Sequence, residues 1–139
     1  MFPDGALGVA EAEYWEPVTD SLITVRGVGE QQVPGLLEAV VAIRSGRGHP
    51  ALQLNRPDGS SLSIATDGTR CALVWVNSLG ESFHSTGGMP GPLVCFDYHG
   101  SWSEAPAEWA IPACDALSCA RRFIRHGTPD TEGVLFEPD

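Results

Sequence analysis

The segment FDYHGSWSEAPAEWAIP, residues 96–112, brings acidic and basic side chains close together in the sequence. Asp97 and His99 are separated by one residue in an expected strand, so their side chains point to the same face. With Glu104 they could supply carboxylate and imidazole groups for general acid–base catalysis. Because such pairs arise readily by chance, we favour a structural or surface role for His99. The catalytic set of Asp97, His99 and Glu104 stays open as the alternative.

The rest of the chain lacks the common signatures of catalysis and cofactor binding. It has no hydrolase elbow, phosphate-binding loop, dinucleotide glycine fingerprint or zinc-helix motif. Cys95 and Cys119 sit in apolar patterns, which disfavour the thiolate that a nucleophile needs. No Cys-x-x-Cys pair or Cys/His metal spacing is formed by the cysteines, which are Cys71, Cys95, Cys114 and Cys119. We therefore expect free thiols, no metal and no cofactor.

Two tryptophans in the same segment, Trp102 and Trp109, are more informative. Trp and Tyr are the commonest anchors of protein interfaces, because they bring a large contact area at a small entropy cost. The neighbouring acidic, aromatic and imidazole side chains are Asp97, Tyr98, His99, Glu104 and Glu108. Together these residues predict an aromatic anchor inside an acidic rim, which suits a cationic cleft on another protein. Either tryptophan could instead close the end of the sheet as core, and composition leaves both interpretations open.

Hydrophobic periodicity predicts the elements that position these residues. The alternation in ALQLN and SLSIAT, joined by the turn residues RPDG, indicates a β-hairpin. Two apolar stripes with helical spacing, each ending before a glycine, predict helices at 34–45 and 112–126. We expect strands at 21–27, 51–55, 61–66, 71–77, 81–86, 93–98 and 133–138, with a loop from about 99 to 111. This order predicts an α+β fold, a mostly antiparallel sheet of five or more strands with two helices packed on it.

Length and charge limit the classes of function. A chain of 139 residues, 42% hydrophobic and 19% charged, is typical of one globular domain. It has no lysine, and its net charge is −10. Residues 1–20 and 71–120 each contain five acids and no Lys or Arg. Direct nucleic-acid binding needs a basic surface, so we expect a basic protein partner instead.

The N-terminal residues and the hydropathy suggest how the chain is organised and where it works. Residues 1–20 are acidic without clear periodicity, so we expect an N-terminal arm followed by a single domain at 21–139. No stretch reaches the roughly 18 apolar residues of a membrane span. The start of the chain has neither a basic region nor an apolar run, so it does not resemble a signal peptide. We therefore expect a cytoplasmic protein that does not enter a membrane.

The C-terminal half resembles a known family. FDYHGSWSEAPAEWAIPACDALSCARRFIRHGTP is similar to the bacterial immunity proteins that accompany polymorphic toxins, in their first-numbered family, which is often paired with deaminase toxins. Upstream, LQLNRPDGSSLSIA and CALVWVN resemble the central hairpin and the following strand of that family. The resemblance spans roughly residues 21–137. The matching positions are Gly100 after an aromatic-rich strand, the turn Trp102-Ser103-Glu104-x-Pro106, Pro112 and Phe123 of the helix, then Gly127 and Pro129.

This resemblance implies a non-enzymatic immunity protein that binds a cognate toxin with a basic cleft and occludes its active site. A toxin that acts on nucleic acid, such as a deaminase, needs a basic substrate groove that an acidic protein can occupy. Two alternatives remain. One is a small enzyme or ligand-binding protein on the same fold, recruited to a small-molecule biosynthetic role, with Asp97, His99, Glu104 or Tyr98 in a pocket. The other is an interaction domain without a toxin.

Overall fold

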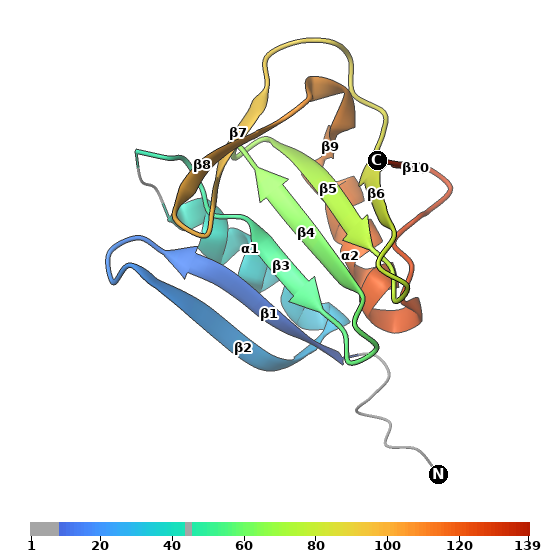
Figure 1. The fold of residues 1–139 in the computed structure, drawn as a ribbon, viewed down its shortest axis with the longest axis horizontal. Coiled ribbons are helices and arrows are strands. Elements are labelled where there is room, and N and C mark those ends of the chain that lie inside the picture. The colour runs from blue at the N-terminus through green and yellow to red at the C-terminus, as the bar shows by residue number, and fades with distance from the viewer. Residues whose placement is uncertain (1–8, 44–45) are drawn as a thin grey trace.

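The computed structural model describes residues 9–43 and 46–139, and it consists mainly of a sheet in front of two helices (Figure 1). The strands of this sheet are β1 (Val9–Glu16), β2 (Ser21–Gly29), β3 (Leu52–Asn55), β4 (Ser61–Thr66), β5 (Arg70–Val76), β6 (Ser82–Ser85), β9 (Ala110–Pro112) and β10 (Phe136–Pro138). In the described residues their order is β10-β6-β5-β4-β3-β1-β2, with β9 paired to β5, and every pairing is antiparallel.

A second, smaller sheet is the hairpin of β7 (Val94–Tyr98) and β8 (Ser101–Ala105). The helices are α1 (Val33–Ala42) and α2 (Ala113–His126), and both lie behind the large sheet in Figure 1. The predicted α+β class, with an antiparallel sheet of at least five strands and two helices packed on it, is confirmed for the described residues.

The two faces of the large sheet differ because side chains alternate along each strand. Leu52, Leu54, Leu62 and Ile64 of β3 and β4 are fully buried against the helices. We call this helix-covered side the back face. The positions between these residues carry small or polar side chains on the opposite side, the front face, which the hairpin β7–β8 crosses (Figure 1).

Helix α2 contributes most of the helical core, and its C-terminal end is held by a side chain from the sheet. Phe123 and Ile124 are fully buried, and Gly127 ends the helix with φ of 84°. The guanidinium of Arg56, in the turn between β3 and β4, donates hydrogen bonds to the backbone oxygens of Phe123 and Ile124. The Phe123 oxygen also accepts the N–H of Gly127 at 2.7 Å, and a positive group at the carbonyl end of a helix is favoured by the helix dipole.

The acidic N-terminal segment differs from the predicted arm. Residues 9–16 form β1, an inner strand that pairs with β2 on one side and β3 on the other. Ala10 and Ala12 are buried and alternate with Glu11 and Glu13, a period of two that small alanines made hard to detect. The part of the prediction that concerns residues 1–8 lies outside the described residues.

The expected loop after residue 98 is also different, because β8 continues as the second strand of a tight hairpin. His99 and Gly100 form its two-residue turn, with φ of 50° and 87°. Positive φ at both central positions is the geometry that matches the twist of paired strands, and glycine adopts it without strain. The remaining elements shift by a few residues: α1 ends at Ala42, and the last strand begins at Phe136.

Candidate functional site

Asp97 is a buried structural carboxylate of the hairpin. Its exposed fraction is 0%, and its Oδ1 atom accepts a hydrogen bond of 2.8 Å from the backbone N–H of Gly100 in the turn. Its Oδ2 atom lies 3.4 Å from Nε of Arg47. Its backbone also bonds to the segment before β3, through His49 O at 2.8 Å and Ala51 N at 2.9 Å. Asp97 therefore closes the turn and attaches the hairpin to the large sheet.

The acid–base set considered from the sequence is not assembled in this arrangement. The ring of His99 stacks on Tyr98, with centroids 4.3 Å apart and an interplanar angle of 18°. Glu104 is exposed and pairs in register with Cys95, whereas Asp97 pairs with Trp102. Among the described residues, no hydrogen bond or ion pair joins any two of Asp97, His99 and Glu104. General acid–base catalysis by these groups therefore has no geometric support.

The two tryptophans have different environments. Trp102 lies on β8 with 53% of its surface exposed. Trp109 is half-buried in a 3₁₀ turn at Ala107–Trp109, where its ring stacks on His84 with centroids 4.2 Å apart. The backbone oxygen of Trp109 accepts a hydrogen bond of 2.7 Å from the hydroxyl of Ser85. Trp109 therefore packs into the protein, while Trp102 offers an aromatic surface to solvent, beside Glu104 on the same strand.

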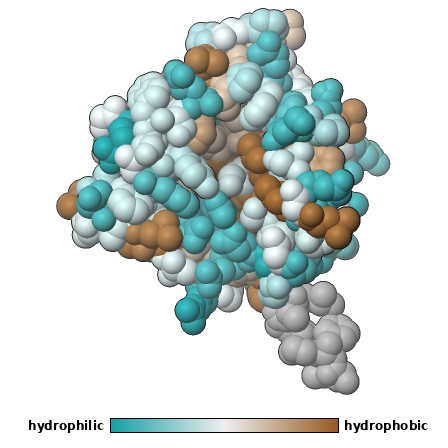
Figure 2. Space-filling view, viewed as in Figure 1, coloured by the Kyte–Doolittle hydropathy of each residue, from teal (hydrophilic) through white to brown (hydrophobic). Residues whose placement is uncertain are grey.

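A groove separates the hairpin from the front face of the sheet. The space-filling view shows a hollow near the centre of this face, with residues coloured as hydrophobic inside it (Figure 2). We call it the front groove; its volume is about 380 Å³. Its floor comes from β3, β4 and β5, and its wall comes from the hairpin and the turn after it. The lining residues are Ala51, Gln53, Ser61, Ser63, Ala65, Ala72, Val74, Val76, Phe96, Tyr98, Glu104, Ala105 and Trp109.

Of the residues predicted from the sequence, Tyr98, Glu104 and Trp109 line the front groove, and Asp97 and His99 do not. Glu108 is exposed in the turn beside Trp109. The small front-face residues of β3, β4 and β5 were not predicted as site residues. The alternation of ALQLN and SLSIAT puts Ala, Gln and Ser on that face, which is the ordinary pattern of a sheet face open to solvent and therefore gave no signal of a site.

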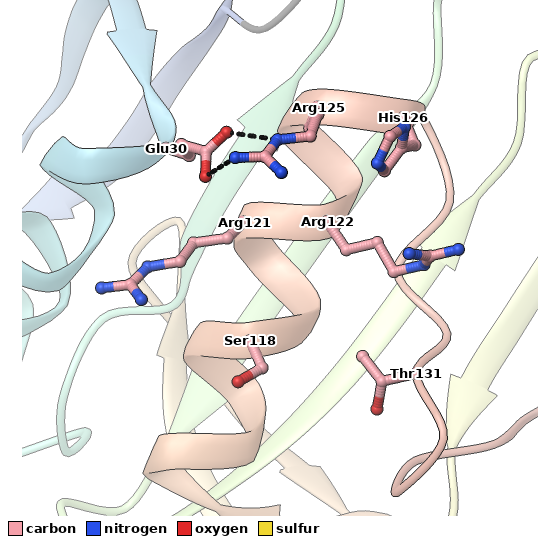
Figure 3. A pocket seen from close by; sticks show the side chains of 7 residues that line it. All are labelled: Glu30, Ser118, Arg121, Arg122, Arg125, His126 and Thr131. Atoms are coloured by element: carbon pink, nitrogen blue, oxygen red, sulfur yellow. Dashed lines mark hydrogen bonds and ion pairs between the residues drawn. The ribbon is translucent and has the colours of Figure 1, made fainter.

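A second depression lies along α2, between the helix and the segments on either side of it (Figure 3). Its volume is about 310 Å³. Arg125 donates to both carboxylate oxygens of Glu30 at 2.7 Å, so this guanidinium is already paired. Arg121 and Arg122 point to opposite sides of the helix in Figure 3. These charges do not converge on one point, and their position in the last turns of α2 suits the helix dipole. The lining residues are Glu30, Ser118, Arg121, Arg122, Arg125, His126 and Thr131.

The buried thiols are poor nucleophiles. Burial raises the pKa of Cys71 to about 11, and burial together with the charge of Asp115 raises the pKa of Cys119 to about 12. All four cysteines are free thiols, as predicted. Over residues 9–43 and 46–139, no group of three or more His, Cys, Asp or Glu side chains is placed to hold a metal ion. Nor does the described part of the chain contain a helix long and apolar enough to cross a membrane.

Comparison with known proteins adds one match. A family model described as "Immunity protein Imm1" matches residues 8–134, which include the whole large sheet except β10, the hairpin β7–β8 and both helices. No match to the chain was found among curated proteins.

Proposed function

The chain belongs to the Imm1 family of immunity proteins, which supports a toxin-neutralising role, and from this premise we propose how it acts. It binds the toxin domain with the hairpin β7–β8 and the turn that follows, and it covers the toxin's active site. Inhibition is then a matter of binding alone, and the immunity protein performs no chemistry on the toxin.

The observation that carries this proposal is the exposed Trp102 on an ordered hairpin. Large aromatic side chains contribute most when they are fully desolvated at the centre of an interface. Trp102 is 53% exposed and Tyr98 is 42% exposed, so both have surface that a partner can cover. The hairpin already has a defined conformation, because Asp97 bonds both to its turn and to the segment before β3. Binding would therefore cost little loop-ordering entropy.

Charge suggests the kind of toxin. Glu104 and Glu108 flank the aromatic surface and are exposed, and the whole chain carries a net charge of −10. An enzyme that acts on nucleic acid holds its phosphates with basic side chains, so its substrate cleft attracts an acidic protein. We propose that the partner is a nucleic-acid-acting toxin, such as a deaminase, with a basic cleft, and that the two proteins meet in the cytoplasm.

Co-expression tests the proposal directly. Cells that produce the toxin encoded beside this protein should survive when the protein is co-produced, and they should die when its Trp102→Ala variant replaces it at the same level. In vitro, the purified protein should inhibit the toxin's activity at a one-to-one ratio and should compete with the toxin's substrate. Tight binding without any loss of toxin activity would contradict occlusion of the active site, and equal survival with and without the protein would contradict neutralisation of that toxin.

A further inference from the structure

The front groove exists because the front face of the sheet carries small side chains. On the back face, β3 and β4 present Leu52, Leu54, Leu62 and Ile64 to the helices. On the front face the same two strands present Gln53, Ser61, Ser63 and Ala65, whose side chains do not fill the space between the sheet and the hairpin. The resulting volume of about 380 Å³ is roughly ten times the ~30 Å³ that a water molecule occupies in the liquid. The groove therefore has room for a long side chain.

The groove is held open by contacts at both ends of the hairpin. The guanidinium of Arg70 donates hydrogen bonds of 2.9 and 3.2 Å to the backbone oxygens of Pro92 and Leu93, just before β7. At the other end, the turn residue Gly100 lies against the indole of Trp15, where an added Cβ would come within 3.3 Å of the ring. Because these contacts fix the hairpin relative to the sheet, the groove does not have to be formed on binding.

The chemistry of the lining selects the occupant. One wall is aromatic, from Phe96, Tyr98 and Trp109, and the floor under it continues through Val74 and Val76. Glu104 is the one charged residue among the described residues that line the groove. It pairs in register with Cys95, so its side chain leaves β8 on the face opposite Phe96 and Tyr98, which puts the carboxylate at the rim of the groove. Within the described part of the chain, it makes no hydrogen bond or ion pair with another side chain. The groove thus combines an apolar channel with a carboxylate at its rim that forms no ion pair with the described residues.

We infer that the front groove receives an arginine side chain of the toxin, with its apolar stem along Val74 and Val76 and its guanidinium at Glu104. This inference rests on the proposed function. Long basic side chains bury their methylene stems while the charged head meets a polar group. Arginine fits better than lysine, because its planar head pairs with a carboxylate through two hydrogen bonds and also stacks on aromatic rings such as that of Tyr98. An arginine bound in the front groove would no longer be available to the toxin's own substrate cleft.

A pair of glutamate variants tests this inference with the toxin domain encoded beside the protein. Glu104→Gln removes the carboxylate at the rim of the groove, whereas Glu38→Gln removes the same charge from an exposed position of α1, on the opposite side of the sheet. We expect Glu104→Gln to raise the dissociation rate by ~10-fold or more, because truncating a buried charge pair acts on dissociation. Glu38→Gln should leave the dissociation rate within about 2-fold, because it lies outside the proposed contact.

A groove-filling variant tests the steric part independently. Ser63→Trp places a large ring on the groove floor, and Thr24→Trp places the same ring on the exposed strand β2, away from the groove. We expect Ser63→Trp to weaken toxin binding at least ~100-fold and Thr24→Trp to change it by less than about 3-fold. Circular dichroism and denaturant unfolding check that both variants fold. If Ser63→Trp does not fold, the comparison of Glu104→Gln with Glu38→Gln tests the inference instead.

A double-mutant cycle identifies the occupant. Each arginine and lysine of the toxin's contact surface is replaced by alanine and combined with Glu104→Gln. One arginine should lose most of its effect in the Glu104→Gln background, a coupling of about 10-fold or more. Coupling to a lysine, or to no basic residue at all, would overturn the arginine assignment. If Trp102→Ala weakens binding while Glu104→Gln and Ser63→Trp bind like the wild type, the inference fails and the proposed function stands. If the wild-type protein does not bind the toxin, the proposed function itself fails.

Discussion

At the scale of single residues, Asp97 shows why catalytic spacing in a sequence does not imply catalysis. It lies two residues from His99, yet its carboxylate is directed into the protein, to Gly100 N–H at 2.8 Å and Arg47 at 3.4 Å. A buried carboxylate with such partners stabilises a turn, because the alternative is an unsatisfied charge in an apolar environment. The residues available to a partner are its exposed neighbours on the hairpin, Tyr98 and Trp102.

The two tryptophans should therefore respond differently to replacement by alanine. Trp102→Ala should weaken toxin binding by ~2 kcal/mol or more, since an exposed anchor acts through the interface. Its unfolding free energy should change by less than about 0.5 kcal/mol. Trp109→Ala should instead lower the unfolding free energy by about 3 kcal/mol, because its ring packs against His84 and the small cluster under the hairpin.

Urea unfolding and calorimetric titration with the toxin measure both quantities for each variant. Equal loss of stability in the two variants would mean that Trp102 is also part of the core. If Trp102→Ala binds the toxin with unchanged affinity, the hairpin is not at the centre of the contact.

The thiols offer a second test of the residue environments. Cys114 is exposed and Cys95 is partly exposed, whereas Cys71 and Cys119 are buried with raised pKa values of about 11 and about 12. At pH 8 in native buffer, a disulfide reagent should modify Cys114 first and Cys95 more slowly, because it attacks accessible thiolates. The other two should react only after denaturation, which should bring the total to four. A Cys114→Ser variant should lose the fastest phase, and rapid native modification of Cys71 or Cys119 would contradict their burial.

At the scale of elements, the 3₁₀ turn at Ala107–Trp109 depends on a glycine outside it. A Cβ added at Gly88 would lie 2.0 Å from the backbone oxygen of Ala107 and 2.9 Å from that of Ala110. Gly88 also donates its N–H to the backbone oxygen of Glu108 at 3.0 Å. The loop before β7 and the turn after β8 therefore touch backbone to backbone, which positions Trp109 in the wall of the front groove.

Gly88→Ala should lower the unfolding free energy by roughly 1–3 kcal/mol, because backbone atoms must move to relieve the overlap. Gly91→Ala in the same loop is the matched control, since its nearest neighbour would be a comfortable 4.0 Å away. Thermal unfolding measures the stability of both variants, and the indole signal of Trp109 in NMR spectra reports the position of the turn. Equal stability of the two variants would show that the loop and turn do not pack as described.

The elements that could be predicted from the sequence are those with strong periodicity. Helix α2 lies within one residue of its predicted start, because its apolar stripe and Gly127 mark both ends. Strand β1 was missed since Ala10 and Ala12 are weak apolar markers among acids. Strand β8 was missed because its register depends on positive φ at His99 and Gly100, and the usual Asn-Gly or Asp-Gly pair that marks such a turn is absent there. The front groove combines strands far apart in sequence, and only the position of the hairpin over the sheet creates it.

At the scale of the whole molecule, the two sides carry different charge. Glu104 and Glu108 lie on the hairpin and the turn after it, and Glu13 lies on the front side of β1. The arginines of α2, Arg121, Arg122 and Arg125, lie on the outer side of the helix layer. A basic partner is therefore attracted toward the acidic residues around the front groove, whereas Arg121 and Arg122 weaken the attraction on the helix side, where Arg125 is already paired with Glu30. This arrangement orients the encounter as well as accelerating it.

Association with a basic toxin should consequently depend strongly on ionic strength. Charges separated by more than the Debye length, about 10 Å at 0.1 M salt, are largely screened from each other. We expect the association rate constant to fall at least ~10-fold between about 0.05 and 0.5 M salt, while the dissociation rate changes by less than about 3-fold. Glu108→Gln should lower the association rate at low salt and should lose this effect at high salt, since it removes a steering charge outside the groove. Stopped-flow association rates that do not depend on salt would show that the acidic front does not steer the toxin. A dissociation rate that rises with salt as steeply as the association rate falls would place the salt-sensitive charges inside the final contact.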